Sequence, residues 1–110
     1  MDKLKRGQVG EELATVMLLE KGYQILERNY SCKCGELDII ARRGRTICFV
    51  EVKTRLSDTY GMGREAVDSK KQRHIKNSAQ CYLMQTNVPY NSIDFQVVEI
   101  TLEHITGLSF

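Results

Sequence analysis

Long apolar runs are missing from this 110-residue sequence, because no segment approaches the ~18 consecutive apolar residues that span a bilayer. The basic residues at the N-terminus are followed by a polar segment with two glutamates, where a secretion signal would have an apolar core. These two absences predict a protein that makes no membrane contact and is located in the cytoplasm.

A strong charge imbalance is missing as well. The formal net charge is only +2, with 42% hydrophobic and 27% charged residues, and this composition is typical of an ordinary globular protein. The sequence also lacks repeats, low-complexity segments and linkers. We therefore expect a single domain over residues 1–110, and any basic surface that binds a polyanion must be local.

Neither histidine of the sequence lies at metal-ligand spacing from any of the four cysteines, and this weakens the interpretation of the cysteines as a zinc site. Cys32 and Cys34 form a Cys-x-Cys pair, whereas Cys48 and Cys81 are isolated in the sequence. Thiols stay reduced in a reducing cytosol, and a buried thiol behaves as a small hydrophobe. The sequence therefore favours four free thiols, with zinc as the alternative.

Two short segments rich in branched and aromatic residues, 35–42 and 46–55, are predicted strands. The basic turn between them contains a glycine, which can adopt positive φ. A four-residue turn over residues 43–46 would place Asp38 directly opposite Glu51. A shift of two residues would keep the two acids on the same side as diagonal neighbours, whereas a shift of one would put them on opposite faces.

Charged side chains interrupt the apolar pattern of both strands. Because side chains alternate along a strand, Glu36 shares a face with Asp38. By the same rule Glu51 shares a face with Lys53. Carboxylates this close repel each other unless one is protonated or a cation lies between them. Oxygen ligands suit a hard ion such as Mg²⁺, which can activate water and neutralise phosphate charge, so the pattern favours phosphodiester hydrolysis.

The rest of the chain predicts two helices and two further strands, arranged as an α/β layer fold with a mixed sheet. Apolar residues at three- and four-residue steps indicate the first helix, and Asp68 is a suitable N-cap for the second. We expect the C-terminal tail to pack back through Leu108 and Phe110. The predicted bounds are helix Gly7–Lys21, strand Tyr23–Tyr30, turn Ser31–Gly35, loop Leu56–Gly63, helix Ser69–Gln85 and strand Ile93–Leu102.

Basic residues crowd the first two turns of the second helix, although the helix dipole favours acids there. Phosphate binding would account for them, because lysines and free backbone amides both attract anions. For Lys71 and Lys76 a solvated charged face is favoured, and His74 and His104 are expected at the surface or as caps. The residues of this basic cluster are Lys70, Lys71, Arg73, His74 and Lys76.

Asp38, twelve intervening residues and then Glu51-Val52-Lys53 form an arrangement that resembles the signature of the PD-(D/E)XK nuclease superfamily. Leu37 stands where that signature usually has proline. Motifs spread over most of the chain also resemble the YraN-type family of uncharacterised bacterial proteins. They are Gly7-x-x-Gly10-Glu11, Gly22-Tyr23, Arg28-Asn29-Tyr30, Gly35-Glu36-x-Asp38, Phe49-Val50-Glu51-Val52-Lys53-x-Arg55, Ala66-Val67-x-x-Lys70 and His104-Ile105.

This resemblance implies a restriction-endonuclease-like mixed central sheet flanked by helices, similar to archaeal Holliday-junction resolvases and to the tRNA-endonuclease-like group. It implies nucleic acid as the substrate, with DNA favoured and branched DNA as a candidate. The implied cofactor is Mg²⁺ or Mn²⁺, and a homodimer is left open. Family members usually carry Arg-Phe-Asp where this chain has Ser92-Ile93-Asp94, so a role of that arginine does not transfer.

The resemblance also assigns residues to metal binding, catalysis and nucleic-acid contact. Lys53 would orient the attacking water or stabilise the phosphate, and Glu36 would assist through waters on the metal. The spacing of Glu11 alone indicates only an acid favoured by the helix dipole, and the resemblance brings it to the metal. The assigned residues are Asp38, Glu51, Val52 (by its carbonyl) and Glu11 for the metal, Asp38, Glu51 and Lys53 for catalysis, and Lys70 and Arg55 for nucleic acid.

Two other interpretations of the same residues are open. A nucleic-acid-binding module could use this surface without cutting, in which case binding would depend on salt and Asp38→Asn would have little effect. A structural surface of ion pairs among Glu51, Lys53 and Arg55 is the other. That interpretation ranks last, because it leaves the clustering of three carboxylates and a lysine unexplained.

Overall fold

The helices and strands follow one another in the order predicted from the sequence. The structure, a computed structural model, describes residues 2–56 and 67–102. Two helices pack on a four-stranded mixed sheet, which confirms the α/β fold class. The elements are α1 (Lys3–Glu20), β1 (Gln24–Cys32), β2 (Gly35–Arg43), β3 (Thr46–Leu56), α2 (Ser69–Gln85) and β4 (Ser92–Leu102).

Helix caps explain where the two helices begin. The α1 helix begins at Lys3 and not at the predicted Gly7, because the Asp2 side chain accepts a hydrogen bond from the Lys5 amide at 2.8 Å. The predicted cap of α2 is confirmed, since Asp68 accepts from the Lys71 amide at 2.7 Å. Neither helix is long and apolar enough, over the residues described, to cross a membrane.

Strand bounds differ from the predicted ones by a few residues at most. The largest difference is in β1, which continues through Ser31 to Cys32, so the turn before β2 is shorter than the predicted Ser31–Gly35. The predicted loop beyond Leu56 and the tail residues Leu108 and Phe110 lie outside the described residues.

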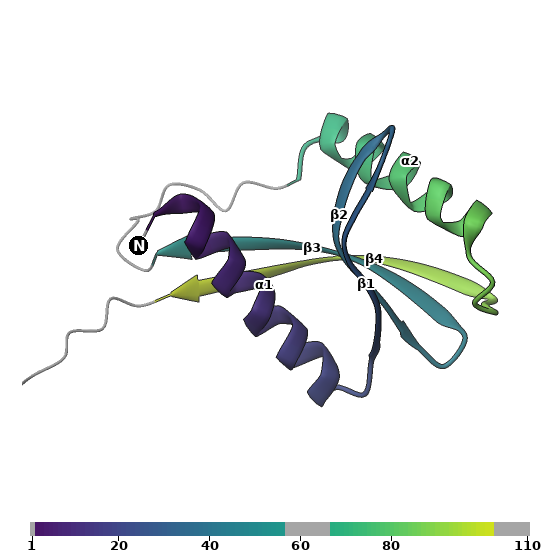
Figure 1. Cartoon of the computed structure of the whole chain (residues 1–110), viewed down its shortest axis with the longest axis horizontal. Helices are drawn as coiled ribbons and strands as arrows, with labels where there is room; N and C mark the ends of the chain where they lie inside the picture. Colours follow the sequence, from purple (N-terminus) through teal and green to yellow (C-terminus); the bar gives the residue numbers. More distant parts are fainter. Residues whose placement is uncertain (1, 57–66, 103–110) are drawn as a thin grey trace, which may run out of the picture.

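The sheet has the strand order β1-β2-β3-β4 (Figure 1). The strands β1, β2 and β3 form an antiparallel meander, whereas β4 pairs parallel to β3. A parallel pair needs a crossover connection, and α2 lies within it. The two helices lie on opposite faces of the sheet, so each face has its own core.

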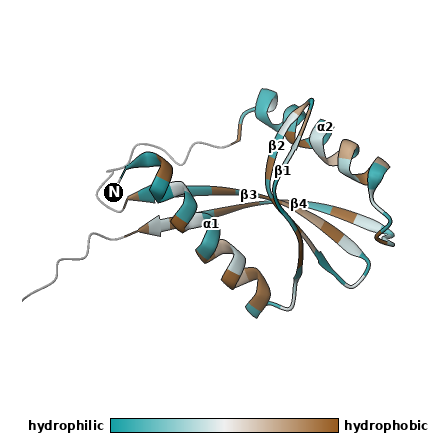
Figure 2. Ribbon diagram, in the orientation of Figure 1, coloured by the Kyte–Doolittle hydropathy of each residue, from teal (hydrophilic) through white to brown (hydrophobic). Residues whose placement is uncertain are grey.

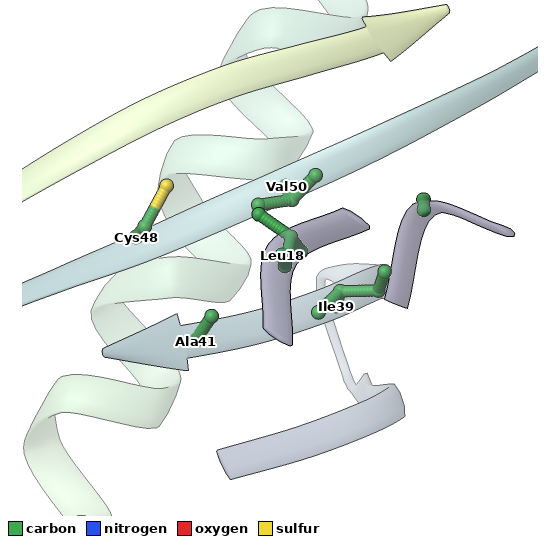
Figure 3. Packing of buried hydrophobic residues seen from close by; sticks show 6 residues of the cluster. Leu18, Ile39, Ala41, Cys48 and Val50 are labelled. Carbon is green, nitrogen blue, oxygen red and sulfur yellow. The ribbon is translucent and has the colours of Figure 1, made fainter. Parts of the chain in front are cut away.

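Alternation along β3 divides the apolar side chains between the two cores. Cys48 and Val50 pack with Leu18 of α1 (Figure 3). Ile47 and Phe49 belong to the core under α2. The first turns of the α2 helix itself are hydrophilic, as Figure 2 shows. The complete buried sets are Ala14, Leu18, Ile39, Ala41, Cys48 and Val50 for α1, and Leu37, Ile40, Ile47, Phe49, Ala79 and Tyr82 for α2.

The pairing of β2 with β3 stops in the middle of the sheet. Its register runs from Arg43 opposite Thr46 to Ile39 opposite Val50. Past that point the β1–β2 hairpin turns away from β3 toward α2, as Figure 1 shows, and Leu37 packs in the core under α2. The strands β2 and β3 therefore separate beside Asp38 and Glu51, the carboxylates that come next along them. This separation opens space around the two acids.

Candidate metal and nucleic-acid site

The hairpin register brings Asp38 and Glu51 together. Arg43 pairs with Thr46 across a turn in which Gly44 has φ 62°, and Ile39 pairs with Val50. The predicted four-residue turn and its register are thus confirmed, and the two acids come next along it. The carboxylate of Asp38 accepts a hydrogen bond of 2.7 Å from the backbone amide of Val52. This bond fixes one oxygen of Asp38 beside β3.

Glu51 is a buried acid, with only 9% of its surface exposed. Burial, followed by the hydrogen bond and charge of Asp38, raises its pKa to about 8, while the charge of Lys71 opposes the shift. Near neutral pH the pair therefore holds a proton, or needs a cation if both acids are to be ionised. Such a strained pair of carboxylates is frequent at functional sites.

Glu11 approaches the pair from α1. The adjoining Gly10 is buried, and a Cβ at that position would overlap the Thr54 side chain on β3. Only glycine permits this close packing of α1 on β3. Burial, followed by the charge of Asp38, raises the pKa of Glu11, while Arg28 lowers it from a distance of 4.0 Å. Glu11 is therefore within electrostatic reach of the acid pair, where the family resemblance expects it.

Asn29 of β1 also belongs to this site, although the sequence indicated no role for it beyond its place in the Arg28-Asn29-Tyr30 motif. Its neighbours pair as Arg28 with Ile39 and Tyr30 with Leu37, so Asn29 falls opposite Asp38. Asn29 has φ 53°, an uncommon conformation for a residue without glycine's freedom. The Asn29 side chain also opposes the rise in the pKa of Glu11. Asparagine adopts positive φ more readily than most other non-glycine residues, so its identity is a weak sequence signal for this conformation.

Two open cavities meet at this cluster. One, of about 390 Å³, lies between the separated strands and the start of α2. The other, of about 730 Å³, lies beside the start of α1. Glu36 lines both of them. The linings are Gly35, Glu36, Asp38, Glu51, Asp68, Lys70, Lys71, His74 and Ile75 for the first, and Lys3, Leu4, Gly7, Gln8, Glu11, Asn29 and Glu36 for the second.

The start of α2 contributes cations to the first cavity. Lys70 lines it, next to the acids, and so does the exposed His74. Lys71, for which the sequence favoured a solvated face, is half exposed but also places its Nζ 3.8 Å from Oε1 of Glu51. It lies one turn before Ile75 on the buried stripe of α2, and this spacing could have revealed its position.

Arg55 and Lys53 lie farther along β3. Arg55 forms an ion pair of 3.2 Å with Glu99 of β4. Lys53 is half buried, pairs in register with Glu99, and shares the side of β3 that Glu51 occupies, by strand alternation. Val52 contributes its amide to Asp38. The structure thus brings Glu11, Glu36, Asp38, Glu51 and Lys70 together and places Arg55 in a contact of its own.

The donor set fits a hard divalent cation. Asp38 and Glu51 offer carboxylate oxygens, and Mg²⁺ commonly takes one or two carboxylates and completes its shell with water. Among residues 2–56 and 67–102, the carboxylates do not form a compact triad of ligand atoms, since the only triad within 4.8 Å consists of cysteines. The acids therefore fit a two-carboxylate site, with Glu11 and Glu36 able to act through water.

Comparison with known proteins identifies the chain at the level of its family. The sequence model of the family described as "Uncharacterised protein family UPF0102" matches residues 10–100. The chain belongs to this family. The UPF0102 protein of Moorella thermoacetica is 43% identical over 103 residues, covering 94% of this chain and 86% of its own. That of Caldicellulosiruptor saccharolyticus is 46% identical over 100 residues, covering 91% and 85%.

The UPF0102 match confirms the family resemblance that the motifs indicated. A third UPF0102 protein, from Syntrophus aciditrophicus, is 46% identical over 100 residues, with 91% of this chain and 79% of its own covered. The matched segment includes Glu11, Asp38 and Glu51. Because these names state no activity, the function of this UPF0102 protein must be argued from the site.

Proposed function

We propose that this UPF0102 protein is an endonuclease of the PD-(D/E)XK type that hydrolyses phosphodiester bonds with Mg²⁺ or Mn²⁺. DNA is the favoured substrate, with branched DNA as the leading candidate. The observation that carries the proposal is the pairing of Asp38 with the buried Glu51 where β2 and β3 separate. The basic start of α2 lines the same cavity.

The metal would be held by Asp38 and Glu51, with the Val52 carbonyl, and with Glu11 and Glu36 through water. When bound, such an ion lowers the pKa of a coordinated water and neutralises charge on the phosphate. The Val52 amide occupies one oxygen of Asp38, so the carboxylate is oriented before any ion arrives. This preorganisation supports metal binding, because the ligand loses little freedom on binding.

Protein cations would act on the nucleic acid. Lys53 would orient the attacking water or stabilise the phosphate from the side of β3 that carries Glu51. Lys70 and Lys71 would hold the phosphate backbone at the start of α2, where both line the cavity of the acid pair. Lys71 would exchange its contact with Glu51 for one with phosphate. Arg55, also predicted to contact nucleic acid, would first have to leave Glu99.

Cleavage assays test this proposal. A panel of branched and linear DNA, incubated with the protein and Mg²⁺ or Mn²⁺, should show metal-dependent products. Asp38→Asn should abolish cleavage without loss of the fold, whereas Glu20→Gln, at the exposed end of α1, should leave it unchanged. Intact substrates throughout the panel, with either metal, would refute the nuclease activity.

A binding module without catalysis is the second candidate. The ion pair of Lys71 with Glu51 favours it, because a protein cation already compensates the acid without a metal. This function predicts DNA binding that weakens steeply with salt and is unchanged by Asp38→Asn. Gel-shift titrations at several salt concentrations, run beside the cleavage assay, distinguish the two functions.

A further inference from the structure

The tip of the β1–β2 hairpin and α2 bring three cysteines together. Cys32 ends β1, Cys34 follows in the turn, and Cys81 lies on the fourth turn of α2. Their sulfur atoms all lie within 4.8 Å of one another. None of the three forms a disulfide. The isolation of Cys81 in the sequence was misleading, however, because the fold places it beside the Cys-x-Cys pair.

This spacing matches the first coordination shell of a thiophilic ion. Zinc binds thiolate sulfur at about 2.3 Å in tetrahedral geometry, so sulfurs around one ion lie about 3.8 Å apart. The three sulfurs therefore need only small side-chain rotations to meet at a common centre. Cys34 is exposed and Cys32 and Cys81 are half buried, which leaves an entry path and an open fourth position for water.

A buried hydroxyl beside the cluster is a second, independent observation. Ser78 is fully buried, one turn before Cys81, and its hydroxyl meets no acceptor at full hydrogen-bond geometry among the residues described. The hydroxyl lies 3.7 Å from where a Cβ of Gly35 would be, at the hairpin turn. The acceptor it approaches is the Cys32 sulfur. A metal-bound thiolate would satisfy this donor, as outer-shell hydroxyls do in metal sites.

We propose that Cys32, Cys34 and Cys81 form a zinc site with three thiolate ligands and one exchangeable position. Thiolate ligands select a soft ion, whereas the carboxylates of the other site select a hard one. The inference does not depend on the nuclease proposal, since no residue is shared between the two sites.

Zinc at this position would fasten the hairpin to α2. The hairpin carries Glu36 and Asp38, and α2 carries Lys70 and Lys71, all of which line the same cavity. A bound ion would therefore hold the acidic and basic sides of that cavity at a fixed separation. This is a structural role, in which the free energy of metal binding adds to the stability of the fold.

Metal titration of the reduced protein tests the site. Zn²⁺ competition against a chromophoric chelator should give one ion per chain, and Co²⁺ should produce a thiolate-to-metal charge-transfer band. Cys34→Ser, at an exposed position, should weaken Zn²⁺ binding by at least about tenfold, and so should Cys81→Ser. Ser78→Ala should weaken it by about 10-fold or more, because the Cys32 thiolate would lose its outer-shell donor.

Cys48→Ser is the matched control, because Cys48 is buried in the core under α1, away from the three cysteines. This variant should leave Zn²⁺ binding unchanged. Asp38→Asn should leave it unchanged too, which separates the thiolate site from the carboxylate pair. The zinc site is refuted if no Zn²⁺ binds. It is also refuted if Cys34→Ser and Cys81→Ser both bind as wild type does, or if the metal-free thiols oxidise to a disulfide and the reduced protein has no affinity.

Discussion

Among the described residues, Glu51 is the one in which burial and charge conflict most strongly. It has 9% of its surface exposed and faces Asp38 across the hairpin, with Glu11 also near. Lys71 is the cation that opposes these effects, and it is itself half exposed, so solvent screens much of its attraction. The acid is therefore held in an environment that a divalent cation would relieve more fully than this single lysine does.

The first prediction concerns the pH dependence of stability. The pKa of Glu51 is raised from 4.5 to about 8 in the folded protein, so its contribution is fully present below pH 4.5. That contribution is lost as pH rises through about 8. Each unit of displacement corresponds to about 1.4 kcal/mol at most. Urea unfolding of the metal-free protein between these limits should show the decline, and Glu51→Gln should remove this part of it.

Glu20→Gln provides the comparison for that experiment, because this exposed acid lies at the far end of α1 and should keep the wild-type slope. A wild-type slope in Glu51→Gln as well would mean that Glu51 titrates normally.

The second prediction concerns Lys71, whose charge lowers the pKa of Glu51. Lys71→Met keeps most of the side-chain stem and removes the charge, so the pKa of Glu51 should move upward. Because the Lys71 side chain is half exposed, stability should change by less than about 1 kcal/mol. Carboxyl NMR titration of Glu51 measures the shift. Lys76 lies on a different side of α2, where it lines an apolar cavity. Lys76→Met should therefore leave the pKa of Glu51 unchanged.

At the scale of elements, α1 owes its position to a glycine. A Cβ at Gly10 would overlap Thr54 of β3, whereas Gly7, one turn earlier, has nothing within 4 Å of that position. The same substitution should therefore have opposite effects at two sites on one helix. Because Glu11 follows Gly10 directly, the packing of this helix also sets the distance from Glu11 to Asp38.

The third prediction follows from that difference. Gly10→Ala should destabilise the fold by about 1–3 kcal/mol, because α1 must move away from β3. Gly7→Ala should stabilise it by about 0.5–1 kcal/mol, as expected inside a helix. Chemical denaturation measures both changes, and Thr54→Ala in the Gly10→Ala background should recover part of the loss. Equal effects of the two alanines would show that α1 does not pack tightly at Gly10.

Local signals account for what the sequence could predict at this scale. The N-cap Asp68 and the four-residue turn with Gly44 gave the start of α2 and the pairing of Asp38 with Glu51, because a cap and a hairpin register are set by nearby residues. The φ of Asn29, the separation of β2 from β3 and the approach of Cys81 to Cys32 depend on tertiary packing. No pattern in one stretch of sequence carries that information.

For the whole molecule, the acid pair links metal binding to stability. The sheet places Asp38 and Glu51 between the two helices, on strands that belong to both cores. An ion that binds there binds only the folded chain, so it must raise the free energy of unfolding. It must also displace the proton that the raised pKa of Glu51 retains, so binding should strengthen as pH rises.

The fourth prediction tests this linkage by thermal unfolding with Mg²⁺ or Mn²⁺. At an ion concentration 100 times the dissociation constant, the gain should be about 2.7 kcal/mol, and a fixed concentration should give a larger gain at pH 8 than at pH 5. Asp38→Asn should lose the gain at both pH values, while Cys34→Ser should keep it, because hard cations do not seek thiolates. An equal gain in the free energy of unfolding for wild type and Asp38→Asn would show that the ion binds elsewhere. The two acids would then interact only with each other and with Lys71.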